Sequence, residues 1–182
     1  MSPEAALERL LAGNKRYVGD QLAHPDRSPL RREEVKRGQN PFAIIVGCSD
    51  SRVSPEIIFD QGLGDLFIVR VAGNVIGPIE RDSIDYSAQY LGSSLVLVMG
   101  HESCGAVTAV FQGNTADIED VAALIKPAIK NSRDLDAAIR ANIRWMANYL
   151  KQTPCIKRLI SEKKIDVIGA YYHLGSGNVE IL

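Results

Sequence analysis

Four short apolar runs limit what this chain can fold into. They are FAIIVG (42–47), LFIVRVAG (66–73), LVLVMG (95–100) and IDVIGAYY (165–172). Their apolar residues are continuous rather than alternating, which indicates strands buried on both faces and therefore a mainly parallel sheet. Helical patterns separate the runs, so the sequence predicts an α/β fold in which helices flank the sheet and connect its strands by right-handed crossovers.

The predicted helices lie before, between and after these runs. The first is expected from Pro3 to about Tyr17, with Ser2 as its N-cap. Residues 19–40 are polar and contain prolines, which indicates a loop or arm around a short helix. Further helices are predicted at 54–61, 81–91, 104–111, 117–132, 134–150 and 153–164. We expect a single domain over 1–182, with an N-terminal helical arm (1–40) and an α/β core (41–182).

Composition excludes two kinds of partner. The formal net charge of the 182 residues is −1, and no run of lysines and arginines is long enough to follow a nucleic-acid backbone. No apolar stretch approaches the roughly 20 residues that cross a bilayer, and the N-terminus lacks a basic segment followed by an apolar signal core. We therefore expect a cytoplasmic protein. A periplasmic or other exported location is the alternative if a leader has been removed.

Chemically active side chains follow the first and third apolar runs. Cys48, Asp50 and Arg52 come after the first run, and His101 and Cys104 come after the third. Because parallel strands end at one edge of their sheet, we expect these groups to meet there. Extended backbone would also point the side chains at 48, 50 and 52 the same way. Two thiols and an imidazole form a known catalytic zinc set, with Asp50 as the candidate fourth ligand.

Several other interpretations stay open at this point. Three cysteines are too few for a disulfide framework, which favours reduced thiols or metal ligands. Cys48 alone could be a packing residue, and Asp50 with Arg52 a surface ion pair. A hydrolase built on Cys48 and His101 is an alternative that leaves Cys104 without a role. Cys155, beside a proline at a helix start, is interpreted as structural.

The order and spacing of CSDSRV, FIVRVAGN, SIDYSAQYLG and GHESCGAV resemble those of the β-class carbonic anhydrases, over nearly the whole chain. This resemblance implies their α/β fold, with one Zn²⁺ per chain held by Cys48, His101 and Cys104. It implies an Asp50 and Arg52 dyad beside the metal. It also implies a homodimer or homotetramer with active sites at the subunit interface.

The resemblance extends to the substrate pocket of the plant-like members. Gln39 matches a glutamine that contacts substrate, and Phe67 and Tyr86 match aromatic residues of that pocket. Gly105 matches a glycine whose backbone N–H faces the substrate. Ala72 stands where those members have a valine, which implies a slightly wider pocket wall.

The chain departs from the allosteric subgroup of the family. That subgroup has a tryptophan three residues before the first cysteine, where this chain has Ile45. Arg70 matches the arginine of the second bicarbonate site in that subgroup, but one residue does not make the site. We therefore do not expect allosteric inhibition by bicarbonate.

The expected reaction is the reversible hydration of CO₂ to bicarbonate and a proton. Zinc lowers the pKa of its bound water to about 7, so a zinc-bound hydroxide is present at neutral pH to attack CO₂. Asp50, fixed by Arg52, can accept a hydrogen bond from that hydroxide and orient its lone pair. The alternatives are a carbonyl sulfide or carbon disulfide hydrolase on the same fold, and a noncatalytic zinc module closed by Asp50.

Overall fold

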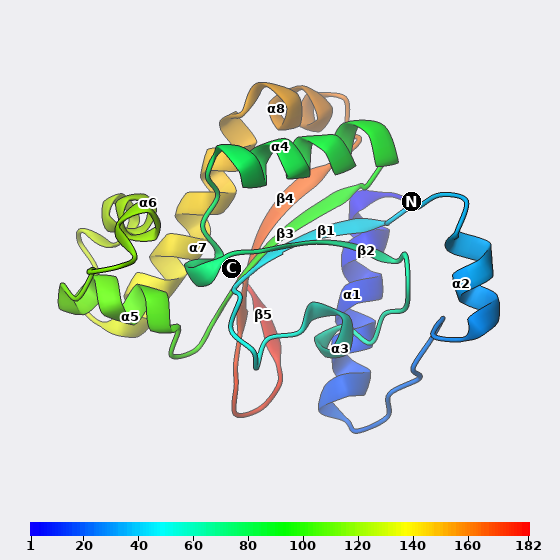
Figure 1. Cartoon of the computed structure of the whole chain (residues 1–182), viewed down its shortest axis with the longest axis horizontal. Helices are drawn as coiled ribbons and strands as arrows, with labels where there is room; N and C mark the ends of the chain where they lie inside the picture. The colour runs from blue at the N-terminus through cyan, green and yellow to red at the C-terminus, as the bar shows by residue number, and fades with distance from the viewer.

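The computed structural model describes all residues, 1–182, and has a five-stranded sheet at the centre of the molecule (Figure 1). The strands are β1 (Ala43–Gly47), β2 (Leu66–Arg70), β3 (Leu95–His101), β4 (Asp166–Tyr172) and β5 (Val179–Ile181). Their order is β2-β1-β3-β4-β5, with the first four parallel and β5 antiparallel to β4. The prediction of a mainly parallel sheet is confirmed, and each of the four apolar runs forms a strand. The apolar runs do not predict β5.

Helices cover both faces of this sheet. They are α1 (Pro3–Val18), α2 (Pro29–Val35), α3 (Pro55–Ile58), α4 (Pro78–Tyr86), α5 (Gly105–Gln112), α6 (Glu119–Ile129), α7 (Leu135–Gln152) and α8 (Pro154–Ser161), with a 3₁₀ turn η1 (Ala72–Asn74) and a π-helical segment η2 (Ser87–Leu91). Side chains of α1 and α3 join one apolar cluster, and side chains of α4 to α8 join the other. Four predicted helices differ in extent: 54–61 contains only the single turn α3, and 81–91 begins earlier, in α4, and ends as η2. The helices predicted at 117–132 and 153–164 are shorter, as α6 and α8.

The strands β1 and β3 separate the two clusters of the core. In β1, Ile44 and Val46 pack into the larger cluster, whereas Ala43 and Ile45 pack into the smaller one. This division follows from the alternation of side chains along a strand. Every residue of β1 and β3 is buried, which explains why both runs are continuously apolar. Burial of each large aliphatic side chain stabilises the fold by about 1.5–3 kcal/mol.

The N-terminal segment has one packed helix and one exposed helix. Helix α1 begins as predicted, since the Ser2 hydroxyl accepts a hydrogen bond from the Ala5 N–H. Its Ala6 and Leu10 are fully buried in the smaller cluster. Helix α2 buries no side chain, and its Leu30 is 77% exposed. The division of the domain at residue 40 stays a prediction.

No helix of the chain combines the length and the apolar composition that crossing a bilayer requires.

Candidate metal centre

Three metal-binding side chains lie together where β1 and β3 end. These strands are parallel neighbours, so Cys48, directly after β1, lies near His101, the last residue of β3. Cys104 precedes the first turn of α5. The sulfur atoms of both cysteines and a ring nitrogen of His101 lie within 4.8 Å of one another, and all three residues are buried. The structure therefore brings together the three residues for which the sequence predicts zinc binding.

The orientation of the His101 ring suits a metal ligand. Its Nδ1 lies 2.9 Å from the carbonyl oxygen of Glu102, which can only accept, so Nδ1 carries the hydrogen and donates a hydrogen bond to this carbonyl. Its Nε2 is buried and has no hydrogen-bond partner in the protein. A buried nitrogen with a free lone pair is costly unless something binds it. A divalent metal ion held with the two sulfur atoms would satisfy this nitrogen, so the residues present fit zinc.

The two thiols are electrostatically linked. Their sulfur atoms are 4.0 Å apart. A hydrogen bond from Cys104, together with His101 nearby, lowers the pKa of Cys48 to about 4 despite the burial of this thiol. The neighbouring Cys48 sulfur and burial both raise the pKa of Cys104. The protein alone thus stabilises one thiolate at this site, and a bound cation would favour the second.

Cys48 also receives a hydrogen bond from the backbone. The Gly73 N–H donates to the Cys48 sulfur at 3.3 Å. Gly73 has a φ of +71°, and a Cβ atom there would approach Ile125 Cδ1 to 2.8 Å, so both backbone and space favour glycine. The side-chain amide of Asn142, on α7, in turn donates to the Gly73 carbonyl at 2.8 Å. Sequence analysis missed both residues. The signal available in the sequence for Asn142 was an asparagine among the apolar residues Ile139, Ile143 and Met146 that form one face of the predicted helix 134–150.

Asp50 lies beside the three predicted ligands and is paired with Arg52. The Arg52 guanidinium donates to both carboxylate oxygens, at 2.9 and 2.7 Å, and the Arg52 N–H donates to one of them at 2.9 Å. These bonds hold the pKa of the Asp50 carboxyl well below its usual range. One oxygen of Asp50 is 3.8 Å from His101 Nε2. The carboxylate is therefore ionised and close to the cluster, yet its hydrogen bonds go to Arg52.

The expectation that extended backbone would align residues 48, 50 and 52 is wrong in detail. The chain turns after Asp50, where the Val53 N–H donates to the Asp50 carbonyl, and Arg52 lies within this turn. The contact between Asp50 and Arg52 thus comes from a side chain that bonds the backbone two residues further on, a turn typical of aspartate.

The predicted substrate residues form two groups according to how they are connected to the cluster. Ala72 and Gly105 are chain neighbours of Gly73 and Cys104, so both lie beside the cluster. The other three are not chain neighbours of the metal-binding residues: Gln39 is exposed, Tyr86 is 48% exposed, and Phe67 is half-buried on β2, where it packs against the larger apolar cluster. Within one chain no hydrogen bond joins any of these three to the metal-binding residues.

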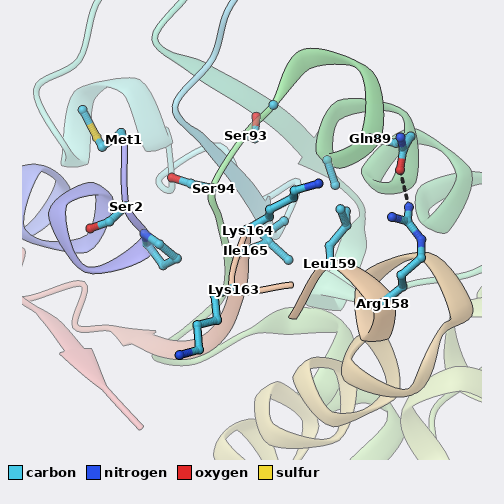
Figure 2. A pocket seen from close by; sticks show the side chains of 13 residues that line it. Met1, Ser2, Gln89, Ser93, Ser94, Arg158, Leu159, Lys163, Lys164 and Ile165 are labelled. Carbon is cyan, nitrogen blue, oxygen red and sulfur yellow. Dashed lines mark hydrogen bonds between the residues drawn. The ribbon is translucent and has the colours of Figure 1, made fainter. Parts of the chain in front are cut away.

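A separate surface pocket of about 390 Å³ lies at the opposite edge of the sheet (Figure 2). It is bounded by the start of α1, by Ser93 and Ser94 before β3, and by the turn between α8 and β4. Arg158 contacts Gln89 (Figure 2), and both Arg158 and Lys164 contact the carboxylate of Glu162. The pocket contains no cluster of metal-binding or nucleophilic side chains, so the candidate active site is at the carboxyl edge of the sheet.

Fold and site together define an α/β protein with two cysteines and a histidine at the carboxyl edge of a parallel sheet. A family model described as "Carbonic anhydrase" matches residues 43–179. The chain therefore belongs to the carbonic anhydrase family. Its similarity to a β-carbonic anhydrase of known structure, at 26% identity and a TM-score of 0.77, confirms the β class that the sequence resemblance predicts.

Curated relatives and solved structures agree with this assignment. The chain is 35% identical to a carbonic anhydrase of Mycolicibacterium smegmatis, over 99% of this chain and 93% of the relative. It is also 35% identical to carbonic anhydrase 2 of Mycobacterium tuberculosis, over 97% and 91% of the two chains. The β-carbonic anhydrase CafA of Aspergillus fumigatus has a TM-score of 0.77 at 26% identity, over 97% of this chain and 90% of that chain. One of two tetrameric β-carbonic anhydrases from Sordaria macrospora has a TM-score of 0.76 at 22% identity, over 97% and 96%, which shows the shared fold.

Proposed function

We propose that Cys48, His101 and Cys104 hold one zinc ion and that the chain catalyses the reversible hydration of CO₂ to bicarbonate and a proton. The observation that carries the proposal is the buried, unpartnered Nε2 of His101, which lies with two thiols that are 4.0 Å apart. Two sulfur ligands and one imidazole favour zinc over magnesium or calcium, which prefer oxygen ligands. Membership of the carbonic anhydrase family supports the reaction.

The chemistry that zinc supplies when bound is a hydroxide at neutral pH, because the metal lowers the pKa of water to about 7. Asp50 would accept a hydrogen bond from the nucleophile, and so direct its lone pair toward the carbon of CO₂. Arg52 keeps this carboxylate ionised and holds it in a two-bond geometry. The same pairing supports an open fourth position on the metal rather than a site closed by Asp50.

The remaining pocket residues are proposed to come from two chains. Ala72 and the Gly105 N–H would border CO₂ from the chain that holds the metal, and a mostly apolar border suits this substrate. Gln39 and Tyr86 are exposed and form no hydrogen bond with the metal-binding residues of their own chain, which supports a role at the site of a neighbouring subunit. Phe67 packs against the apolar cluster that includes Cys48 and Cys104, so it would border the substrate pocket from within its own chain or from its neighbour. We therefore propose a homodimer or homotetramer with active sites at the subunit interface, built from a single domain over 1–182.

Metal analysis combined with a CO₂ hydration assay tests the proposal. The purified protein is expected to contain about one zinc per chain and to hydrate CO₂. Cys104→Ser should remove most of the metal and the activity, whereas Cys155→Ser, at a half-buried thiol outside the cluster, should leave both nearly unchanged. Equal losses from the two substitutions would contradict the metal assignment. Faster turnover of carbonyl sulfide or carbon disulfide than of CO₂ would replace the proposed substrate and keep the zinc.

A further inference from the structure

Arg70 is the last residue of β2, an edge strand of the sheet. In the parallel pairing of β1 with β2 it lies opposite Gly47, the last residue of β1. The Arg70 side chain therefore starts at the same edge as the metal-binding cluster, although β2 contributes none of the three metal-binding residues. It is half-buried.

The guanidinium group of Arg70 binds the main chain on both sides of Ser49. Its Nε donates to the Cys48 carbonyl at 2.9 Å, and its Nη2 donates to the Asp50 carbonyl at 2.6 Å. Arg70 forms no ion pair with a carboxylate, so these two carbonyls are its hydrogen-bond partners. The planar fork of arginine can hold two acceptors in fixed positions, which a lysine ammonium cannot do.

Gly73 and Arg52 bind the side chains of this segment, but its main-chain carbonyls have little support other than Arg70. Residues 48–50 lie outside any helix or strand. The Asp50 carbonyl also accepts the Val53 N–H at 3.0 Å, whereas Arg70 is the one donor to the Cys48 carbonyl. The segment nevertheless carries both a proposed zinc ligand and the carboxylate beside it. Metal sites need their ligands within a few tenths of an ångström of ideal positions.

We propose that Arg70 is a positioning residue that fixes the main chain from Cys48 to Asp50, and thereby sets the placement of the thiol relative to the carboxylate. Two arginines thus hold Asp50: Arg52 binds its carboxylate, and Arg70 binds its carbonyl. The inference rests on the proposed zinc site for its effect on function. Its effect on the loop itself does not depend on the metal.

The test compares Arg70→Ala and Arg70→Lys with the wild-type protein. Zinc affinity, measured by competition with a chelator, is expected to fall about 10–100-fold in Arg70→Ala, the usual effect of losing a group that orients a metal ligand. Arg70→Lys should lose less, because an ammonium can still reach one carbonyl. Methylguanidinium added to Arg70→Ala should restore part of the affinity. Arg133→Ala, which removes an arginine that is 89% exposed and far from the cluster in the chain, is the control and should bind zinc as the wild type does.

Hydrogen exchange on the metal-free proteins separates this inference from the zinc proposal. The amides of Arg52 and Val53 donate to Asp50, so both should exchange faster in Arg70→Ala, while the amides of β3 should keep their wild-type rates. Unchanged exchange at 52 and 53, or wild-type zinc affinity in Arg70→Ala, would overturn the inference. A loss of affinity that methylguanidinium does not reduce would also overturn it, because general damage to the fold would then be the cause. If the wild-type protein binds no zinc but the amides of Arg52 and Val53 exchange faster in Arg70→Ala, the proposed function is contradicted and the role of Arg70 in holding the loop is kept.

Discussion

Replacing Asn142 with alanine tests the contacts that support the Cys48 sulfur. Asn142 is fully buried on α7, and its Nδ2 donates to the Gly73 carbonyl at 2.8 Å. The Gly73 N–H in turn donates to Cys48 at 3.3 Å. The hydrogen bond of this side chain goes to Gly73 and not to a metal ligand, so we expect the effect on the site to pass through Gly73.

The size of the effect follows from the burial of the groups involved. Without Asn142 the Gly73 carbonyl loses a buried donor, which costs about 1–3 kcal/mol. The truncation also leaves a small cavity, which adds to the loss. One contribution to the free energy of unfolding favours the variant: the Asn142 Oδ1 is buried without a hydrogen-bond partner, and alanine removes this unfavourable group. We expect a net loss of about 2 kcal/mol in the free energy of unfolding, or about 4–8 °C in Tm for a chain of this length.

Asn148→Ala is the matched control, since Asn148 lies on the same helix with its side chain exposed. Alanine has the higher helix propensity, so this variant should be neutral or slightly stabilised. Urea denaturation of the metal-free proteins gives the stabilities, and chelator competition gives the zinc affinities. We expect Asn142→Ala to bind zinc up to about tenfold more weakly, because the thiolate loses part of its fixed hydrogen bond. Equal stability and equal zinc affinity in the two variants would refute the reasoning.

Three further predictions concern substrate, metal access and pH. Gln39→Ala should lower CO₂ turnover with the zinc content unchanged, as stopped-flow hydration and metal analysis would show; unchanged turnover would remove Gln39 from the pocket. Arg52→Ala should let Asp50 bind the metal, so CO₂ hydration at pH near 8 should fall without loss of zinc. A crystal structure of this variant with water on the zinc and Asp50 turned away would rule this prediction out. Asp60 is buried, and hydrogen bonds from Arg16 and two backbone amides outweigh the effect of burial and lower its pKa. Asp60→Asn should therefore lower the free energy of unfolding by about 2–3 kcal/mol at pH 7. This difference from wild type should shrink as pH falls below about 4, because a carboxyl with a lowered pKa stabilises the fold only while it is ionised. A difference in unfolding free energy that is the same at pH 7 and pH 3 would contradict this prediction.

The sequence predicted those features that depend on local pattern and on the geometry of parallel strands. Continuous apolar runs identify β1 to β4: β1 and β3 are buried throughout, β4 is largely buried, and β2 is mostly half-buried at the edge of the sheet. The meeting of Cys48 with His101 follows from the common edge at which parallel strands end. The β5 strand has only three residues, and its pairing with β4 depends on a turn that hydrophobic periodicity does not encode.

Features that depend on contacts between distant segments were not predictable in this way. Gly73 is 25 residues from Cys48, and Asn142 is 69 residues from Gly73. Arg70 is conspicuous in the sequence as a charge at the end of an apolar run, but the acceptors of its hydrogen bonds are carbonyl groups, which every residue has. Side-chain pattern alone therefore cannot identify the partner of such an arginine.

The position of the metal centre depends on the register of strands that supply no ligand. Arg70 is the last residue of β2 and binds the carbonyls of Cys48 and Asp50. Gly73 follows just after the strand and binds the Cys48 sulfur. The register of β2 against β1 places Arg70 opposite Gly47, and that of β4 against β3 places Tyr172 opposite His101. The Tyr172 carbonyl accepts the N–H of Glu102, the residue whose own carbonyl orients the histidine ring. A slip of one residue between β2 and β1 would turn the Arg70 side chain to the other face of the sheet. A slip between β4 and β3 would move the Tyr172 carbonyl away from the Glu102 N–H. Either slip would remove hydrogen bonds while all three ligands remained in the sequence. The apolar residues that fix the register of β2 and β4 therefore also determine the geometry of the zinc site.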